Sequence, residues 1–427
     1  DEGKVSWDDP VTRHLPWFQL RDPFVTREVT LRDLLSHRTG VGAAYNGYVT
    51  VDRHEIVRRT RYLEPVRPFR TRYDYSNIMY STAGEAGAAA GGKPWEQLLE
   101  ERILRPLGML ETTTDVSRFF DSTRFTRCFY CPLPAEPVSI THAKSGVDVA
   151  MPHVLRDGTV KPIPWQSYDN AVSAGSVISN ATEMAEWLKL LVGEGRHGGR
   201  QLIRAETFRE MFRPQSILDP TGWIAMVDEL SPSTHFWSYG LGWRMNDYRG
   251  RKIVWHTGGI VGFLAYVGVI PEERLGIAIL SNGDLGYELV PQALALRIAD
   301  LHIGAPVRDW SAELLAKMRA DQERQAAAEA QLLAARKTGT RPSRPLADFA
   351  GEYRSDLYGR TVVTVEGANL AFRIVDGAAG TLEHWHDDLF ALRMNSTTPG
   401  RYFTTFETDV RGQIVRMNVA GLGTFER

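Results

Sequence analysis

The sequence has very few cysteines: 2 in 427 residues, Cys128 and Cys131, in the stretch RCFYCPLP. A C-x-x-C pair is typical of half a metal site or of a redox pair. A zinc site needs about four ligands, and no second cysteine pair completes one. We interpret the two cysteines as structural thiols, with a disulfide between them as the alternative. We expect no metal and no cofactor.

Long hydrophobic runs are also missing, and neither sign of charge dominates. No run reaches the roughly 18 apolar residues of a membrane helix, so we expect no membrane span. The formal net charge is -2, which gives no overall attraction to nucleic acid or to a membrane surface. With 43% hydrophobic and 24% charged residues, the chain has the composition of a globular protein, and its length predicts two or more compact units.

Helical and strand-like segments alternate over the first 300 residues. Leucines at helical spacing in TLRDLLSHRTGVG predict a helix that ends at Thr39-Gly40, and PWEQLLEERILRPLGM and SNATEMAEWLKLLVGEG show similar patterns. Between residues 238 and 283, SYGLGWRMNDYRGRKIVWHTGG and FLAYVGVIPEERLGIAILSNG predict strand hairpins with turns near 247–250 and 271–273. The fold class predicted is α+β, an antiparallel sheet flanked by helices.

A change in composition marks the C-terminal part of the chain. Residues 311–337 are rich in Ala, Glu, Gln and Arg and predict a helix, which TGTRPSRP then breaks. Short alternating runs such as NLAFRIV and RYFTTFETD follow and predict a small antiparallel β-barrel, whose apolar interior is a potential ligand site. We divide the chain into a first domain (1–308), a helical linker (309–345) and a barrel domain (346–427).

Seven stretches occur in an order that carries a family resemblance: LLSHRTGV, YDYSNIMYSTAGE, ILRPLGMLETT, AGSVISNATEMAEWL, YGLGWRM, HTGGIVGF and LGIAILSNGD. In this order and spacing they resemble the serine β-lactamase-like hydrolases, which include class C β-lactamases, D-amino-acid peptidases, penicillin-binding-protein-like carboxypeptidases and esterases. The resemblance covers residues 1 to about 300, and the tail is similar to the lipocalin-like domain of some members. It implies a β-lactamase/transpeptidase-like fold and hydrolysis of an amide or ester through an acyl-enzyme, with a peptide, a D-amino-acid peptide, a β-lactam or a carboxylic ester as the substrate.

Tyr75 and Asn77 match the family's Tyr-x-Asn motif. The resemblance implies that Tyr75 takes the proton of a serine nucleophile and later protonates the leaving group, helped by a lysine that favours the phenolate. It implies that the Asn77 amide donates to a substrate carbonyl and accepts from that lysine. Taken singly, Tyr75 reads as a buried aromatic residue and Asn77 as a turn or cap residue.

The stretch His256-Thr257-Gly258-Gly259 matches the family's Lys-Thr-Gly-like strand, with His in the place of Lys. The resemblance implies that His256, Thr257 and Gly258 bind substrate and that the Gly259 N–H is an oxyanion donor. Taken singly, these residues read as a structural histidine and a strand bend. Because a histidine is mostly neutral at pH 7, an ester, an amide or a D-amino-acid peptide is as good a substrate as one with a carboxylate.

The family's S-x-x-K nucleophile motif is missing from the sequence, since no serine has a lysine three positions after it. Thr141-His142-Ala143-Lys144 imitates it only in part. The first residues, DEGKVSWDDPV, lack both Met and the features of a signal peptide. We therefore expect roughly 60 residues with the nucleophile before Asp1, in the same protein or in a separate fragment, and leave a cytoplasmic or an exported location open. The alternative is a catalytically silent binding protein with this fold.

Two charged stretches remain. Arginines are frequent from Arg53 to Arg72, among acidic and aromatic residues, and we interpret them as a solvated face or a rim that attracts anionic substrates rather than a nucleic-acid patch. His384 and His386 in LEHWHDD share one face of a predicted strand, which suggests metal ligation. An exposed polar face is the better interpretation of these histidines.

Overall fold

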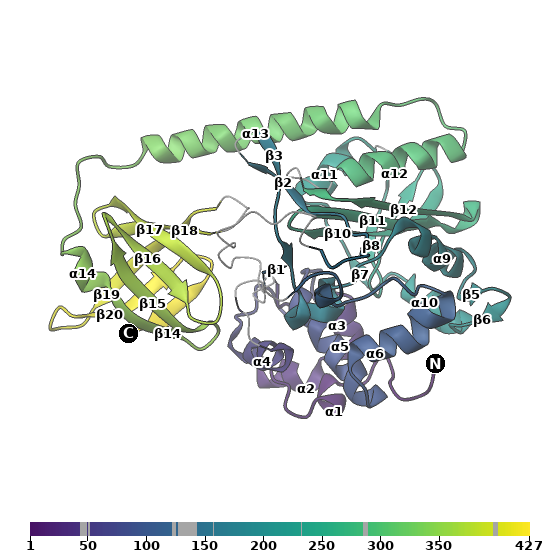
Figure 1. Ribbon diagram of the computed structural model, residues 1–427, viewed down its shortest axis with the longest axis horizontal. Coiled ribbons are helices and arrows are strands. Elements are labelled where there is room, and N and C mark those ends of the chain that lie inside the picture. Colours follow the sequence, from purple (N-terminus) through teal and green to yellow (C-terminus); the bar gives the residue numbers. More distant parts are fainter. Residues whose placement is uncertain are drawn as a thin grey trace.

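The computed structural model describes residues 1–42, 49, 52–121, 125–126, 143–156, 158–231, 233–284, 289–395 and 400–427. Figure 1 shows a larger unit of helices and sheet, a smaller barrel beside it, and one long helix that runs from the first to the second. Cys128 and Cys131 lie outside the described residues. Among the described helices, none has the length and apolar character needed to cross a membrane.

An antiparallel sheet with the strand order β12-β11-β10-β9-β8-β7 forms the centre of the larger unit. Its strands are β7 (Ser216–Ile217), β8 (Trp237–Tyr239), β9 (Arg244–Tyr248), β10 (Arg251–Ile260), β11 (Phe263–Ile270) and β12 (Leu275–Ser281). Short pairs and triplets of strands surround it: β1 (Phe125–Thr126), β2 (His153–Arg156), β3 (Thr159–Pro162), β4 (Trp165–Gln166), β5 (Arg196–His197), β6 (Arg200–Gln201) and β13 (Gly283–Asp284).

Helices cover both faces of this sheet. On one face Trp255, Tyr266 and Ile277 belong to the core that includes residues of α11 (Gly222–Glu229) and α12 (Leu289–His302). On the other face Val254 and Val269 belong to the core that includes residues of α9 (Ala181–Val192) and α10 (Ala205–Met211). The alternation of side chains along each strand places apolar residues on both faces. The predicted helix-flanked antiparallel sheet is confirmed.

The remaining helices of the larger unit pack together beside the sheet. They are α1 (Val11–His14), α2 (Pro23–Glu28), α3 (Leu31–Leu35), α4 (Arg53–Arg59), α5 (Asn77–Gly91), α6 (Trp95–Leu99), α7 (Arg105–Leu107) and α8 (Val172–Gly175). The small residues of α5 allow close contact, since a Cβ at Gly84 would lie 2.1 Å from the Ser173 hydroxyl of α8. The predicted helix end at Thr39-Gly40 is wrong: α3 ends at Leu35, because His37 takes a left-handed backbone conformation (φ 54°).

Helix α13 (Trp310–Ala334) connects the larger unit to the barrel across the top of Figure 1. Its first residues are part of the larger unit's core. The Asp300 carboxylate, fully buried, accepts hydrogen bonds from the Tyr248 hydroxyl (2.6 Å), Arg249 Nε (2.8 Å) and Trp310 Nε1 (2.7 Å). Asp300 therefore ties α12, the β9–β10 hairpin and α13 together.

Strands β14 to β21 close into an antiparallel barrel, as predicted. The barrel follows α14 (Leu346–Phe349) and comprises β14 (Gly351–Ser355), β15 (Gly359–Glu366), β16 (Asn369–Ile374), β17 (Ala379–His386), β18 (Leu389–Met394), β19 (Tyr402–Thr408), β20 (Ile414–Val419) and β21 (Gly423–Glu426). Aromatic side chains pack together in its core: the rings of Phe349, Phe390 and Phe406 lie 4.9 to 5.5 Å apart. Closure gives each described strand of the barrel a partner on both sides, which protects the strand edges.

Several contacts among the described residues attach the barrel to the rest of the protein, including a hydrogen bond from Arg59 of α4 to the Leu357 carbonyl (3.2 Å). At the end of α13, Glu329 pairs with Arg401 (2.8 Å), and Arg336 donates to the Trp385 carbonyl (2.6 Å). Near the cleft described below, Gly377 forms a β-bridge with the buried residue Val49. These contacts hold the barrel at the side of the larger unit. The domain boundaries at 308 and 345 remain a prediction.

Removing the Asp300 carboxylate should destabilise the larger unit. We expect Asp300→Ala to lower the free energy of unfolding by about 3 kcal/mol, because buried donors lose their acceptor and Arg249 loses its ion-pair partner. Urea denaturation followed by tryptophan fluorescence measures the change. Glu323→Ala, on the exposed part of α13, is the control and should change stability by less than about 0.5 kcal/mol. Equal losses in the two variants would contradict this role of Asp300.

Candidate active site

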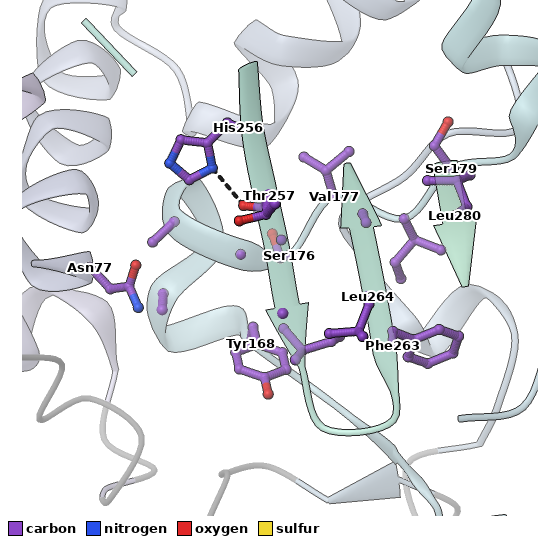
Figure 2. A pocket seen from close by; sticks show the side chains of 18 of the residues that line it. Asn77, Tyr168, Ser176, Val177, Ser179, His256, Thr257, Phe263, Leu264 and Leu280 are labelled. Atoms are coloured by element: carbon purple, nitrogen blue, oxygen red, sulfur yellow. Dashed lines mark hydrogen bonds between the residues drawn. The ribbon is translucent and has the colours of Figure 1, made fainter. Parts of the chain in front are cut away.

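A cleft of about 2180 Å³ lies between the sheet and the helices beside it. Tyr75 and Asn77 line this cleft, as do His256, Thr257, Gly258 and Gly259. The structure therefore brings every predicted site residue to one cavity. In Figure 2 the Asn77 amide faces the side of β10 that lies away from β11. No described residue of the barrel lines the cleft.

Strand β10 presents an unpaired edge to the cleft. Its partner β9 pairs with it from Arg251 to Trp255, whereas β11 pairs with it from Val254 to Ile260. Within the described residues, the stretch from His256 to Ile260 therefore has a strand partner on one side only. Gly258 and Gly259 are exposed there. A substrate backbone can approach this edge closely, because neither glycine carries a side chain.

Tyr75 and Asn77 are placed by the loop that precedes α5. Asn77 is the first residue of the helix, and Tyr75, two residues earlier, is 38% exposed. The loop is anchored by Arg70, whose guanidinium donates to the fully buried carboxylate of Asp33 (2.7 Å). Burial raises the pKa of Asp33, but the hydrogen bonds from Arg70, Thr30 and Arg38 together outweigh burial and lower the pKa, so this anchor keeps its charge.

His256 is neutral in this site. Its Nδ1–H donates to the Thr257 carbonyl (2.5 Å), which leaves Nε2 to accept from the Tyr239 hydroxyl (3.1 Å). Burial, and then the nearby Arg244 guanidinium, lower the pKa of His256 to about 3. His256 therefore orders the strand and its neighbour Tyr239, and it brings no positive charge to a substrate.

The positive charge comes from Arg244, which sequence reasoning missed. Arg244 is opposite Trp255 in the β9–β10 register, is 9% exposed and lines the cleft. Its Nη1 donates to the Thr257 hydroxyl (3.3 Å), and its guanidinium carbon lies 5.7 Å from the centre of the Tyr75 ring. Arg244 is the arginine of the YGLGWRM stretch, which lies on the strand next to the HTGG stretch. Only the register of the hairpin shows that the two stretches meet.

The described lining of the cleft contains no lysine. Its four serines all make hydrogen bonds within the protein: Ser167 with the Asp169 amide, Ser176 with the Val172 carbonyl, Ser179 with the Thr112 hydroxyl and Ser281 with the Gly283 carbonyl. Lys144, from the partial imitation of the nucleophile motif, donates instead to the Ser117 carbonyl (2.7 Å). Thr141 and His142 lie outside the described residues.

The arginine-rich stretch reaches the cleft at two points only. Arg67 and Arg72 line it and form ion pairs with Asp74 (2.9 Å) and Asp219 (3.4 Å). Their charges are therefore partly balanced at the rim. His384 is on the barrel, where its Nε2 bonds the Asp387 carbonyl (2.8 Å), and the described residues hold no group of three or more potential metal ligands.

Tyr75 and Asn77 therefore line one cleft together with the glycine-containing edge of β10. The chain belongs to the family described as Beta-lactamase, whose model matches residues 1–300. A second model, described as a domain of unknown function (DUF3471), matches residues 335–426. The predicted membership of the serine β-lactamase-like hydrolases is confirmed.

Relatives with named activities are hydrolases. The unguisins hydrolase ungD' of Aspergillus campestris is 28% identical over 458 residues, which cover 98% of this chain and 71% of that protein. The D-alanyl-D-alanine-carboxypeptidase/endopeptidase AmpH of Escherichia coli is 26% identical and covers 66% of this chain and 65% of its own. The fold also matches an octameric penicillin-binding protein homologue from Pyrococcus abyssi (TM-score 0.56, 19% identity), over all of this chain and 83% of that one.

The neutral His256 predicts a loss of stability in acid. Its folded-state pKa of about 3 is below the usual value of 6.5, so between these values the unfolded chain binds a proton that the folded chain does not. The contribution of His256 to the free energy of unfolding is complete above pH 6.5. It is lost as the pH falls, by at most about 1.4 kcal/mol per pH unit for one proton.

We therefore expect His256→Asn to flatten the fall in unfolding free energy between about pH 7 and about pH 5, measured by urea denaturation. His302→Asn, at the exposed end of α12, is the control for the loss of a histidine away from the site. The same slope in the wild type and in His256→Asn would show that His256 does not cause the pH dependence.

Proposed function

We propose that this protein hydrolyses an amide or ester bond, in a peptide or a D-amino-acid peptide, through a covalent acyl-enzyme. The observation that carries the proposal is the placement of Tyr75, Asn77 and the open edge of β10 around one cleft. A general base and oxyanion donors on two sides of one acyl carbon are what such chemistry requires.

In this proposal Tyr75 takes the proton of a serine hydroxyl while the serine oxygen attacks the substrate carbonyl carbon. The guanidinium of Arg244, 5.7 Å from the Tyr75 ring centre, favours the negative charge of a phenolate. The carbonyl oxygen becomes an oxyanion, which the Gly259 N–H and the serine's own N–H stabilise. Tyr75 then gives the proton to the leaving nitrogen or oxygen, and water releases the acyl group from the serine.

The serine and its lysine are proposed to come from an S-x-x-K segment outside these 427 residues, either N-terminal in the same protein or in a separate chain. Two features support a docking face for it. Within the described residues β12 pairs only with β11, so its other edge is open. Next to it, α12 exposes apolar side chains at helical spacing, Val290, Leu294, Ile298 and Leu301. An open strand edge such as that of β12 is able to pair with an added strand, and an exposed apolar stripe such as that of α12 is able to pack against a covering segment.

The proposed substrate class is a peptide whose group beyond the reacting bond carries a carboxylate. Arg244 replaces the charge that His256 lacks, and its bond to the Thr257 hydroxyl places it at the strand edge. An arginine beside a hydroxyl is well suited to bind a carboxylate. One of the named relatives, a D-alanyl-D-alanine-carboxypeptidase/endopeptidase, supports hydrolysis of an amide over other bonds.

Replacement of the proposed base tests the mechanism. We expect Tyr75→Phe to lower turnover of an activated ester by about a hundredfold or more, the lower range for general acid–base groups, with the fold unchanged. The assay uses the protein expressed with its upstream sequence, and mass spectrometry after a fluorophosphonate probe locates the acylated serine. Tyr62→Phe, exposed and outside the cleft, is the control. Near wild-type turnover in Tyr75→Phe would remove Tyr75 from the mechanism, and no probe adduct on the wild type would favour a silent binding protein.

Replacement of Arg244 tests the substrate class. We expect Arg244→Gln to lower kcat/KM for a peptide ending in a free carboxylate by about tenfold more than for the matching peptide amide. Only the peptide with the free carboxylate loses a charged hydrogen bond, the one that the Arg244 guanidinium donates to it. Arg213→Gln, at an exposed position outside the cleft, should change both substrates equally. Equal losses for the acid and the amide in Arg244→Gln would exclude carboxylate recognition by this residue.

A further inference from the structure

The LLSHRTGV stretch has no part in the chemistry described so far, yet it contacts the proposed base motif directly. His37 is 1% exposed and lies beneath the cleft. Its Nδ1 accepts the N–H of Ser76 (3.1 Å), and its carbonyl oxygen accepts the N–H of Asp74 (2.7 Å). These two amides flank Tyr75. One residue therefore holds the backbone on both sides of Tyr75, and Ser76 also directly precedes Asn77.

We propose that His37 is a positioning residue that sets the place of Tyr75 and Asn77 through the Ser76 amide. The inference rests on the proposed function, because the two side chains it positions are the proposed base and the proposed substrate donor. His37 itself is buried below the loop and does not line the cleft.

The hydrogen bond from Ser76 determines the state of the imidazole. An Nδ1 that accepts has its proton on Nε2, so His37 must be neutral and in one tautomer. Burial first, and then the neighbouring His256 and Arg244, hold the pKa of His37 well below its usual range. The accepting lone pair is therefore retained in neutral and mildly acidic solution.

The backbone at His37 supports the same role. Its φ of 54° is in the left-handed region, which is uncommon for residues other than glycine. This conformation ends α3 and directs both the carbonyl and the ring toward the loop that carries Tyr75. Strained conformations of this kind persist where surrounding contacts enforce them, and they concentrate at functional sites.

The ring of His37 also packs against four tyrosines, so the effect of its bulk must be separated from the effect of its hydrogen bond. Its centre lies 4.4 Å from that of Tyr75, 4.8 Å from Tyr80, 5.0 Å from Tyr239 and 5.5 Å from Tyr73. His37→Phe keeps an aromatic ring and removes the acceptor. His37→Asn removes the ring but places Oδ1 where Nδ1 was, and Asn tolerates a left-handed backbone.

Amide hydrogen exchange tests whether His37 holds the Ser76 amide, and this measurement does not depend on catalysis. We expect the Ser76 amide to exchange at least about tenfold faster in His37→Phe than in the wild type, and at close to the wild-type rate in His37→Asn. Amides of the barrel, such as Phe390, are the internal control. Unchanged protection of Ser76 in His37→Phe would overturn the proposal.

Turnover tests the consequence for the site. In the protein with its upstream sequence, we expect His37→Phe to lower kcat on an activated ester by about tenfold or more with KM changed less than about twofold, and His37→Asn to recover most of that loss. Phe208→Leu, in a separate core, controls for lost stability and should keep its kcat. An equally slow His37→Asn, or the same loss in Phe208→Leu, would overturn the role. A wild type without turnover would refute the proposed function. The exchange result would still decide whether His37 holds the Ser76 amide.

Discussion

The site depends on the point at which β9 stops pairing with β10. Strand β9 begins at Arg244, opposite Trp255, because the chain before it turns sharply: the Gly240 N–H donates to the Trp243 carbonyl (2.8 Å). Gly240 has no room for a side chain, since a Cβ would lie 2.4 Å from the Met211 carbonyl oxygen. A longer β9 would cover the edge from His256 to Ile260. The tight turn therefore opens the strand edge that the cleft and the proposed chemistry use.

The same hairpin brings the positive charge to the cleft. The residue at the lysine-like position, His256, is neutral, and Arg244 on the neighbouring strand is charged and bonds Thr257. Arg244 is close to Tyr75 and to the strand edge at once, so in the proposed mechanism one buried guanidinium serves both the phenolate and the substrate carboxylate. A second positive charge at position 256 would raise the free-energy cost of burying that charge and the Arg244 guanidinium together. The neutral histidine and the arginine are thus a consistent pair.

Local patterns in the sequence were sufficient for the fold class. Helical leucine spacing, the hairpin turns and the alternating runs of the barrel each depend on neighbours a few residues apart, and the structure has a helix-flanked antiparallel sheet and a closed barrel. Tyr75, Asn77 and the HTGG stretch were found through an ordered set of motifs. What sequence reasoning missed depends on distant pairs: Ser76 with His37, 39 positions apart, and Asp33 with Arg70, 37 positions apart. The early end of α3 belongs with these, because the contacts that hold His37 in a left-handed conformation are not local.

Helix α13 sets both the distance and the orientation of the barrel. Its 25 residues span about 37 Å at 1.5 Å per residue, and most of the helix beyond Arg319 is exposed. Adding or removing one residue would shift the barrel by about 1.5 Å and turn it by about 100° around the helix axis. The bonds of Glu329 and Arg336 to the barrel, and the bridge between Gly377 and Val49, would not then form together. Changes in the length of this helix are therefore tolerable only in steps close to whole turns, three or four residues at a time.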